Sequence, residues 1–108
     1  MKFLRVILDQ EIDTEYSVRQ NYPNPFNPLT EITFAVPKAS QVTLSIVDAL
    51  GRVQAVLVDG ERSTGTYSVS WNASHFPSGI CVCRFQARPI VGGQAGDYGE
   101  TKRMTLLK

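Results

Sequence analysis

The sequence predicts an all-β fold, namely an immunoglobulin-like β-sandwich of about seven antiparallel strands. Three observations support this prediction. Short segments of alternating apolar and polar residues recur along the chain, as in half-buried strands. Turn-forming residues separate these segments about every ten residues. No window keeps a helical periodicity for three turns, and 108 residues suffice for one domain with its own core.

The first two strands follow from apolar residues at every second position. Residues 32–36 alternate in this way, and the predicted strand ends at Pro37 because proline lacks a backbone donor. Residues 38–41 are expected to form a turn. The same alternation predicts a second strand over residues 42–47.

The third strand is expected to follow a tight connection. Gly51 is predicted to supply a positive φ there, because glycine adopts such angles without a steric penalty. A strand is then predicted over residues 53–58. Asp59 and Gly60 are expected to open the next turn.

Trp71 is the expected anchor of the core. A fourth strand is predicted to begin at Gly65, and alternation places Tyr67, Val69 and Trp71 on one face. A sugar-binding platform needs aromatic rings on the solvent face, whereas these rings share a face with Val69. We therefore expect core packing, in which replacing a buried tryptophan by alanine costs about 3–5 kcal/mol.

Two further strands complete the predicted sandwich. Residues 72–78 are expected to form a loop, and Gly79 is expected to begin a strand over residues 80–87. The glycine-rich segment at residues 92–97 predicts a hairpin tip. The last strand is predicted over residues 100–107.

The two cysteines, Cys81 and Cys83, stand one residue apart in a predicted strand. Their side chains would point to the same face, with Cα atoms about 6.7 Å apart. This separation and the parallel Cβ directions disfavour a disulfide. We expect buried free thiols that pack as small apolar side chains, so the cysteines do not indicate a redox compartment.

Residues 1–16 are predicted to form a linker or N-terminal extension, with one strand at most, and residues 17–108 to form the domain. The apolar start of the chain is broken by Arg5 and ends at Asp9, which is too short for the apolar region of a signal peptide. If the protein is exported, its signal peptide is expected upstream on a longer parent chain.

The loop of residues 21–28 is the most unusual segment. It reads Asn21-Tyr22-Pro23-Asn24-Pro25-Phe26-Asn27-Pro28. Each proline restricts its own φ and keeps the preceding residue out of the helical region, and asparagine amides can bond nearby backbone groups. We expect a loop that is ordered without a helix and presents Tyr22 and Phe26 at a fixed angle. The simpler alternative is a stiff entry into a β-domain.

The C-terminal part of the chain is basic. Residues 84–108 contain five basic and two acidic side chains. Such charges are common on a solvated edge strand, where they discourage unwanted pairing. The alternative is an electrostatic docking site for a partner.

Motifs of catalysis and metal binding are sparse. His75 is the single histidine, and no serine stands in a Gly-x-Ser-x-Gly context. Asp48, Asp59 and Asp97 occupy expected turns without the calcium-loop pattern, although a calcium site shared by two loops stays open. We expect no enzymatic activity, metal or cofactor. The net charge of +1 does not suggest nucleic acid, and no apolar run is long enough for a membrane-spanning helix.

Several motifs, taken in order, resemble those of a known family. They are Asn21 to Pro28, Ile32-Thr33-Phe34, Val42-x-Leu44-x-Ile46-x-Asp48-x-x-Gly51, Gly65-x-Tyr67-x-Val69-x-Trp71, Ser78-Gly79-Ile80 and Thr101-Lys102-Arg103-Met104-Thr105-Leu106-Leu107-Lys108. Over residues 17–108 the chain resembles the type A C-terminal sorting domain of the type IX (Por) secretion system.

The resemblance implies a recognition loop and a C-terminal signal. The recognition loop is residues 21–28. The C-terminal signal comprises Lys102, Arg103, Met104, Leu106 and Lys108. Four further residues are expected to be structural: Gly51, Gly65, Trp71 and Gly79.

The resemblance further implies a non-catalytic module that follows a cargo domain on the same parent chain. Outer-membrane secretion machinery would recognise it in the periplasm and carry the cargo to the cell surface or outside. A sortase-like surface protease would cut near residues 9–15, and the cargo would be joined to surface lipopolysaccharide. Neither nucleic acid binding nor direct membrane insertion is implied.

Two features differ from the family pattern, and one other function stays open. Cys81 and Cys83 stand where aromatic residues are usual, and the hairpin at residues 89–99 is longer than usual. The alternative is an accessory carbohydrate-binding or adhesive β-sandwich of a secreted hydrolase. That module would bind polysaccharide through exposed aromatic side chains, for which the candidates are Tyr16, Tyr22 and Tyr98. A stand-alone enzyme is disfavoured.

Overall fold

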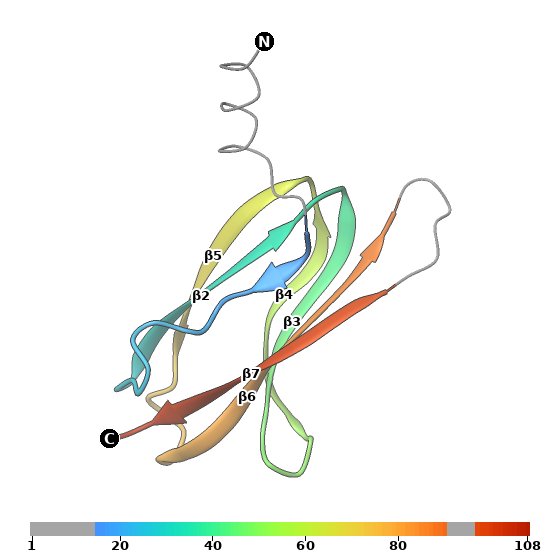
Figure 1. Cartoon of the computed structure of the whole chain (residues 1–108). Coiled ribbons are helices and arrows are strands. Elements are labelled where there is room, and N and C mark those ends of the chain that lie inside the picture. The colour runs from blue at the N-terminus through green and yellow to red at the C-terminus, as the bar shows by residue number, and fades with distance from the viewer. Residues whose placement is uncertain (1–14, 91–96) are drawn as a thin grey trace, which may run out of the picture.

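The structure is a computed structural model that describes residues 15–90 and 97–108. Within these ranges it contains seven strands and no helix (Figure 1). The strands are β1 (Ser17–Val18), β2 (Leu29–Val36), β3 (Ser40–Val47), β4 (Val53–Arg62), β5 (Gly65–Asn72), β6 (Gly79–Pro89) and β7 (Tyr98–Leu106). Most of the predicted linker and hairpin tip lies outside the described residues.

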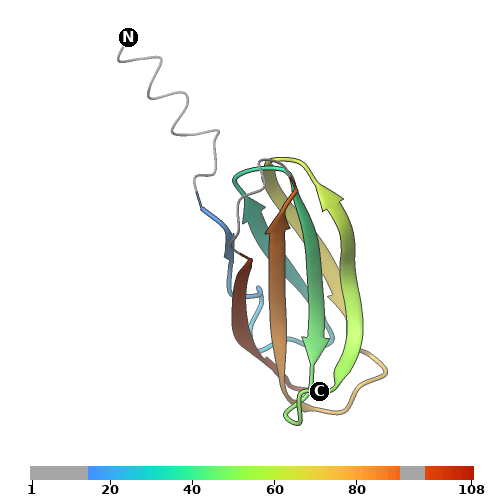
Figure 2. The ribbon, with the colours of Figure 1, turned by 90° about the vertical axis from the view of Figure 1, so that its right-hand side faces the viewer.

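The strands form two antiparallel sheets, which confirms the predicted all-β sandwich. One sheet has the order β1-β2-β5 and the other the order β4-β3-β6-β7. In Figure 2 the four-stranded sheet lies in front of the three-stranded one. In the immunoglobulin constant arrangement the fourth strand belongs to the sheet of the first two. Here β4 pairs with β3 and joins the second sheet.

Two predicted turns are wrong. Ser40 and Gln41 belong to β3, where they pair with residues 61–62 of β4. Asp59 and Gly60 lie within β4 and also pair with β3. The two strands remain paired through their backbones beyond their last apolar residues. Because the prediction used only the alternation of side chains, it placed the strand ends too early.

The core fills the space between the two sheets. The largest fully buried apolar side chains are Phe26, Phe34, Phe85, Ile32, Leu44, Ile46 and Met104. Phe34 of β2 and Phe85 of β6 meet across the layers, with ring centroids 5.4 Å apart. Trp71 is buried and packs against Phe26 and Phe76. This packing confirms the predicted role of Trp71 as a core anchor.

Gly51 makes the tight turn between β3 and β4 possible. Its φ is +83°, as predicted, and its N–H donates to the carbonyl of Asp48 at 3.0 Å. The Asp48 carboxylate accepts hydrogen bonds from the backbone and the guanidinium of Arg52. An L side chain at residue 51 would be strained. Gly65 and Gly79 also have positive φ, at +151° and +153°.

Cys81 and Cys83 are both free thiols, which confirms the expectation of no bridge between them. Cys83 is buried, as predicted, whereas Cys81 is only half-buried. Burial raises the pKa of Cys83 to about 12 and raises the pKa of Cys81 above its ordinary value. Both thiols are therefore protonated and weakly nucleophilic at neutral pH.

Candidate functional site

The loop of residues 21–28 connects β1 to β2 and is ordered by its own side chains. Asn21 is buried, and its amide group donates to the carbonyl of Pro23 at 3.1 Å and to the hydroxyl of Thr30 at 3.0 Å. That hydroxyl donates in turn to the Pro23 carbonyl at 2.9 Å. The peptide bonds before Pro23, Pro25 and Pro28 are cis.

The two aromatic side chains of the loop have opposite environments. Tyr22 is 81% exposed, and its backbone pairs with that of Glu31. Phe26 is only 2% exposed, so the expectation that the loop displays both rings is wrong for Phe26. Its ring packs against Trp71 at a centroid distance of 5.7 Å, because burial in the core removes its apolar surface from water.

The loop is hydrogen-bonded to the last strand. Phe26 and Leu106 form a parallel β-bridge. The N–H of Phe26 donates to the carbonyl of Thr105, and the N–H of Leu107 donates to the carbonyl of Phe26, both at 3.0 Å. The side-chain carbonyl of Asn24 accepts a hydrogen bond from the N–H of Thr105 at 3.0 Å. The loop and the chain end therefore lie at the same end of the sandwich (Figure 1).

The residues of the expected C-terminal signal divide into buried and exposed positions. Met104 and Leu106 are buried in the core. Lys102 is half-buried and forms an ion pair with Glu100, with an N···O distance of 3.3 Å. Arg103 and Lys108 are exposed. The tail thus combines two core anchors with two solvent-facing cations.

The final residue is attached to the loop that precedes β6. The N–H of Lys108 donates to the hydroxyl of Ser78 at 2.9 Å, and its ammonium donates to the carbonyl of Ser74. Leu107 is exposed beside it. We call residues 21–29 together with residues 103–108 the loop–tail surface. It joins the two segments that the sequence singled out separately.

A shallow hollow lies beside Tyr22 on the loop–tail surface. It has a volume of about 240 Å³ and is lined by Tyr22, Pro23, Leu29, Thr30, Glu31 and Ser70. Leu29 is 55% exposed and was not singled out from the sequence. The sequence did contain a signal for this exposure. Leu29 begins a strand whose alternating buried residues stand at even positions, so its side chain is expected on the solvent face. An exposed tyrosine and an exposed leucine give this hollow apolar walls.

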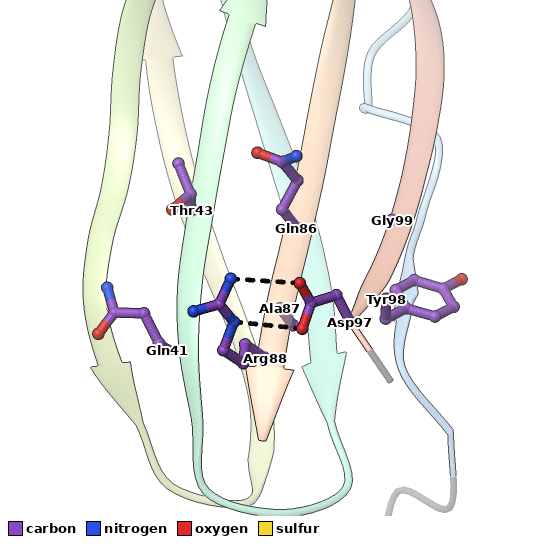
Figure 3. Close-up of a pocket in the computed structure, with 8 residues that line it drawn as sticks. All are labelled: Gln41, Thr43, Gln86, Ala87, Arg88, Asp97, Tyr98 and Gly99. Carbon is purple, nitrogen blue, oxygen red and sulfur yellow. Dashed lines mark hydrogen bonds and ion pairs between the residues drawn. The ribbon is translucent and has the colours of Figure 1, made fainter. Parts of the chain in front are cut away.

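A second hollow lies on the other sheet, and most of the residues that line it have polar side chains (Figure 3). It is lined by Gln41, Thr43, Gln86, Ala87, Arg88, Asp97, Tyr98 and Gly99. The Arg88 guanidinium donates to the Asp97 carboxylate at 3.2 and 3.3 Å. The Tyr98 ring stacks on Tyr16, with centroids 5.3 Å apart. Two of the three aromatic residues expected to bind polysaccharide therefore pack against each other.

Glu100 is the most connected carboxylate near the tail. The Tyr98 hydroxyl donates to it at 2.6 Å, the Val18 N–H donates to it at 3.2 Å, and Lys102 lies beside it. These groups, above all the Tyr98 hydroxyl, hold the pKa of Glu100 below its usual value. The same hydrogen bond raises the pKa of Tyr98 to about 12. Glu100 thus connects β1 and β7.

No group of three or more metal-binding side chains occurs within residues 15–90 and 97–108. His75 lies exposed in the loop between β5 and β6. In the same ranges, no helix is long and apolar enough to cross a membrane. What distinguishes the described chain is an arrangement of two peptide segments at one end of a β-sandwich.

The fold and this arrangement define a class of protein: a β-sandwich module whose characteristic segments gather around its C-terminal strand. The family model described as the secretion system C-terminal sorting domain matches residues 20–90, and the chain belongs to that family. Domains of this family are C-terminal sorting signals of the type IX secretion system, which exports their cargo to the cell surface or outside. Neither the curated proteins nor the solved structures contain a match.

Proposed function

We propose that the outer-membrane secretion machinery binds the loop–tail surface as one unit. The observation that supports this most is the parallel bridge between Phe26 and Leu106. It fixes the recognition loop relative to the tail although the two segments come from opposite ends of the described chain. A receptor that contacts both segments would then bind only the folded domain.

The exposed groups of the loop–tail surface suggest how such a receptor binds. The hollow between Tyr22 and Leu29 can accept an apolar side chain of the receptor, since hot spots are commonly aromatic groups in apolar pockets. Arg103 and Lys108 add exposed positive charge. Such charges accelerate association with an acidic partner more than they strengthen the final complex.

In this proposal the domain is non-catalytic, and the cargo on the same parent chain carries the activity. The domain passes through the periplasm before it reaches the machinery. A sortase-like surface protease then cuts within residues 9–15, ahead of β1, and the cargo is joined to surface lipopolysaccharide. The support is family membership together with the position of residues 9–15 before the first strand of the sandwich.

The test is an export assay with a signal peptide and a fluorescent reporter fused ahead of residues 1–108. In a host with the secretion system, the reporter is expected outside the cell and is expected to stay inside when the machinery is disabled. The double variant Tyr22→Ala, Leu29→Ala should lose most export. Ile90→Ala removes an exposed apolar side chain far from the loop–tail surface along the strands and serves as the control. Normal export of the folded double variant would refute the proposal.

The carbohydrate-binding alternative depends on the polar hollow of Figure 3. Its amides and its ion pair could bond sugar hydroxyls. This hollow has no free aromatic ring, because its tyrosine, Tyr98, stacks on Tyr16, whereas the exposed Tyr22 lies on the loop–tail surface. Retention of the purified chain on polysaccharide columns, lost on replacing Gln41 and Gln86 by alanine, would favour this alternative instead.

A further inference from the structure

The outer face of the four-stranded sheet changes character along its strands. Toward the β3–β4 turn, two cross-strand rows follow from the register: Val56, Ser45, Arg84, Thr101; and Val53, Val47, Val82, Arg103. Ile80 follows on the same face of β6. At the other end the rows are polar and include Gln41, Thr43, Gln86 and Arg88, side by side in Figure 3. The half nearer the β3–β4 turn therefore contains four valines among its eight row residues, and the other half is polar.

In the half that contains the valines, side chains of β4 and β6 on either side are exposed, whereas Val47 and Ser45 of β3 between them are buried. Val53, Val56 and Ile80 are 50%, 55% and 56% exposed, and Val82 beside them is half-buried. The solvent face of an antiparallel sheet ordinarily carries polar side chains at these positions. Adjacent exposed branched side chains mark an interaction surface more often than isolated ones do. We call Val53, Val56, Ile80 and Val82 the valine strip.

Two arginines border the valine strip. Arg84 lies in the row of Val56, and Arg103 is its diagonal neighbour on β7, a spacing of about 7–8 Å between backbones. None of the ion pairs formed within the described residues involves either side chain. The Nε of Arg84 and the Oγ of Ser45, which is opposite in the register, are both buried without a hydrogen-bond partner there. The Nε of Arg84 therefore has no partner in the described part of the fold and, because it is buried, is not itself open to an incoming group.

We propose that the valine strip, with Arg84 and Arg103, docks a protein segment whose apolar side chains are flanked by aspartate or glutamate. A guanidinium binds a carboxylate through charge-assisted hydrogen bonds, and neither arginine has an ionic partner within the described residues. The strip meets the loop–tail surface at Arg103, whose carbonyl accepts a hydrogen bond from Gln20 at 2.6 Å. This inference rests on the proposed function, and the segment belongs to the same machinery that binds the loop–tail surface.

The charges on the rest of the face favour a protein segment over an anionic membrane. Asp59 and Glu61 lie on the outer face of β4 at its polar end, where they pair with Thr43 and Gln41. A flat anionic surface covering the whole face would meet these carboxylates. A narrow segment over the valine strip would meet Arg84 and Arg103 without covering Asp59 and Glu61.

The experiment is site-specific photo-crosslinking in exporting cells that carry the reporter fused to the full chain. Benzoylphenylalanine replaces Val56 in one variant and Thr43, on the polar half of the same face, in the control. An adduct is expected from residue 56 and not from residue 43, and only when the machinery is present. The cross-linked peptide should contain aspartate or glutamate. Arg84→Gln should lower the adduct yield about tenfold, the effect of losing one charge-assisted pair, whereas Arg88→Gln should not.

Other outcomes would overturn the proposal. Equal adducts at residues 56 and 43, or adducts with peptides lacking carboxylates, contradict it. The purified chain can also be tested for co-flotation with vesicles of phosphatidylcholine and phosphatidylglycerol (3:1). Co-flotation that is abolished by Arg84→Gln indicates a lipid partner and contradicts the proposal. If Arg84→Gln unfolds the domain, Val53→Thr tests the strip instead, with the same expected loss. Failure of the unmodified fusion to be exported refutes the proposed function. Normal export together with undiminished adduct yields in both Arg84→Gln and Val53→Thr refutes only this inference.

Discussion

The side-chain carbonyl of Asn24 accepts a hydrogen bond from the backbone N–H of Thr105, 3.0 Å away. Thr105 lies in β7 at the edge of the four-stranded sheet, where the backbone donors that point away from β6 have no neighbouring strand in that sheet. The carbonyl of Thr105 is bonded as well, by the N–H of Phe26. The loop therefore covers the end of an edge strand, and this protects the edge from pairing with another chain.

Replacing Asn24 by alanine should expose this edge locally. The expected loss of stability is about 0.5–1.5 kcal/mol, the net value of one hydrogen bond. Hydrogen exchange of the Thr105 amide should become faster, while amides in the centre of β6 keep their protection. Asn27→Ala is the control, because Asn27 is exposed and makes no hydrogen bond within the described residues. Equal exchange of Thr105 in both variants would contradict the assignment.

The two aromatic residues of the loop should separate stability from export. Phe26→Ala removes a buried ring that packs on Trp71, and we expect a loss of about 3–5 kcal/mol in urea denaturation. Tyr22→Ala changes an exposed side chain, so its stability should stay within about 0.5 kcal/mol of the unmodified chain. In the export assay both variants should fail, the first by unfolding and the second while folded.

Two truncations should distinguish the core part of the tail from its exposed part. Deleting Met104 to Lys108 removes two buried side chains, each of which contributes about 2–5 kcal/mol, and the cargo should stay in the periplasm. Deleting only Leu107 and Lys108 leaves the core intact. We expect this shorter truncation to keep the far-ultraviolet spectrum of the sandwich and to reduce export. Wild-type export by both truncations would exclude the tail from recognition.

Alternation of apolar side chains was enough to predict most of the fold. The pattern over residues 42–47 and the face shared by Val69 and Trp71 report directly which side of a strand is buried. The extent of β4 beyond Val58 could not be predicted in this way. Gly60 reads locally as a turn residue, and only its pairing with Val42 keeps it in a strand.

The site was predictable as two segments and not as one surface. The proline and asparagine pattern of residues 21–28 is visible in the sequence because it restricts the backbone locally. The burial of Phe26 depends on Trp71 and Leu106, which are distant in the chain. Long-range contacts of this kind leave no periodic pattern, so the contact between loop and tail required the structure.

The two thiols should differ in reactivity while the domain is folded. Burial raises the pKa of Cys83 to about 12 and raises that of Cys81 as well, so little thiolate exists at neutral pH. With Ellman's reagent we expect two thiols per chain in denaturant. In the native protein Cys83 should be labelled no faster than the domain unfolds, and half-buried Cys81 should be labelled first. Fewer than two reactive thiols in denaturant without reductant would indicate an oxidised pair.

Glu100 should make the stability of the domain depend on pH in the acidic range. Its pKa in the folded state is lowered below the ordinary value of 4.5, chiefly by the Tyr98 hydroxyl. A carboxylate with a lowered pKa stabilises the fold above its unfolded pKa, and this contribution is lost as the pH falls through the folded value. Urea denaturation should therefore show stability decreasing below pH 4.5 in the unmodified chain. Glu100→Gln should be less stable at neutral pH. It should also lose less stability on acidification, because its contacts to Tyr98 and Val18 no longer titrate. Parallel pH profiles of the two proteins would show that Glu100 is not the titrating link between β1 and β7.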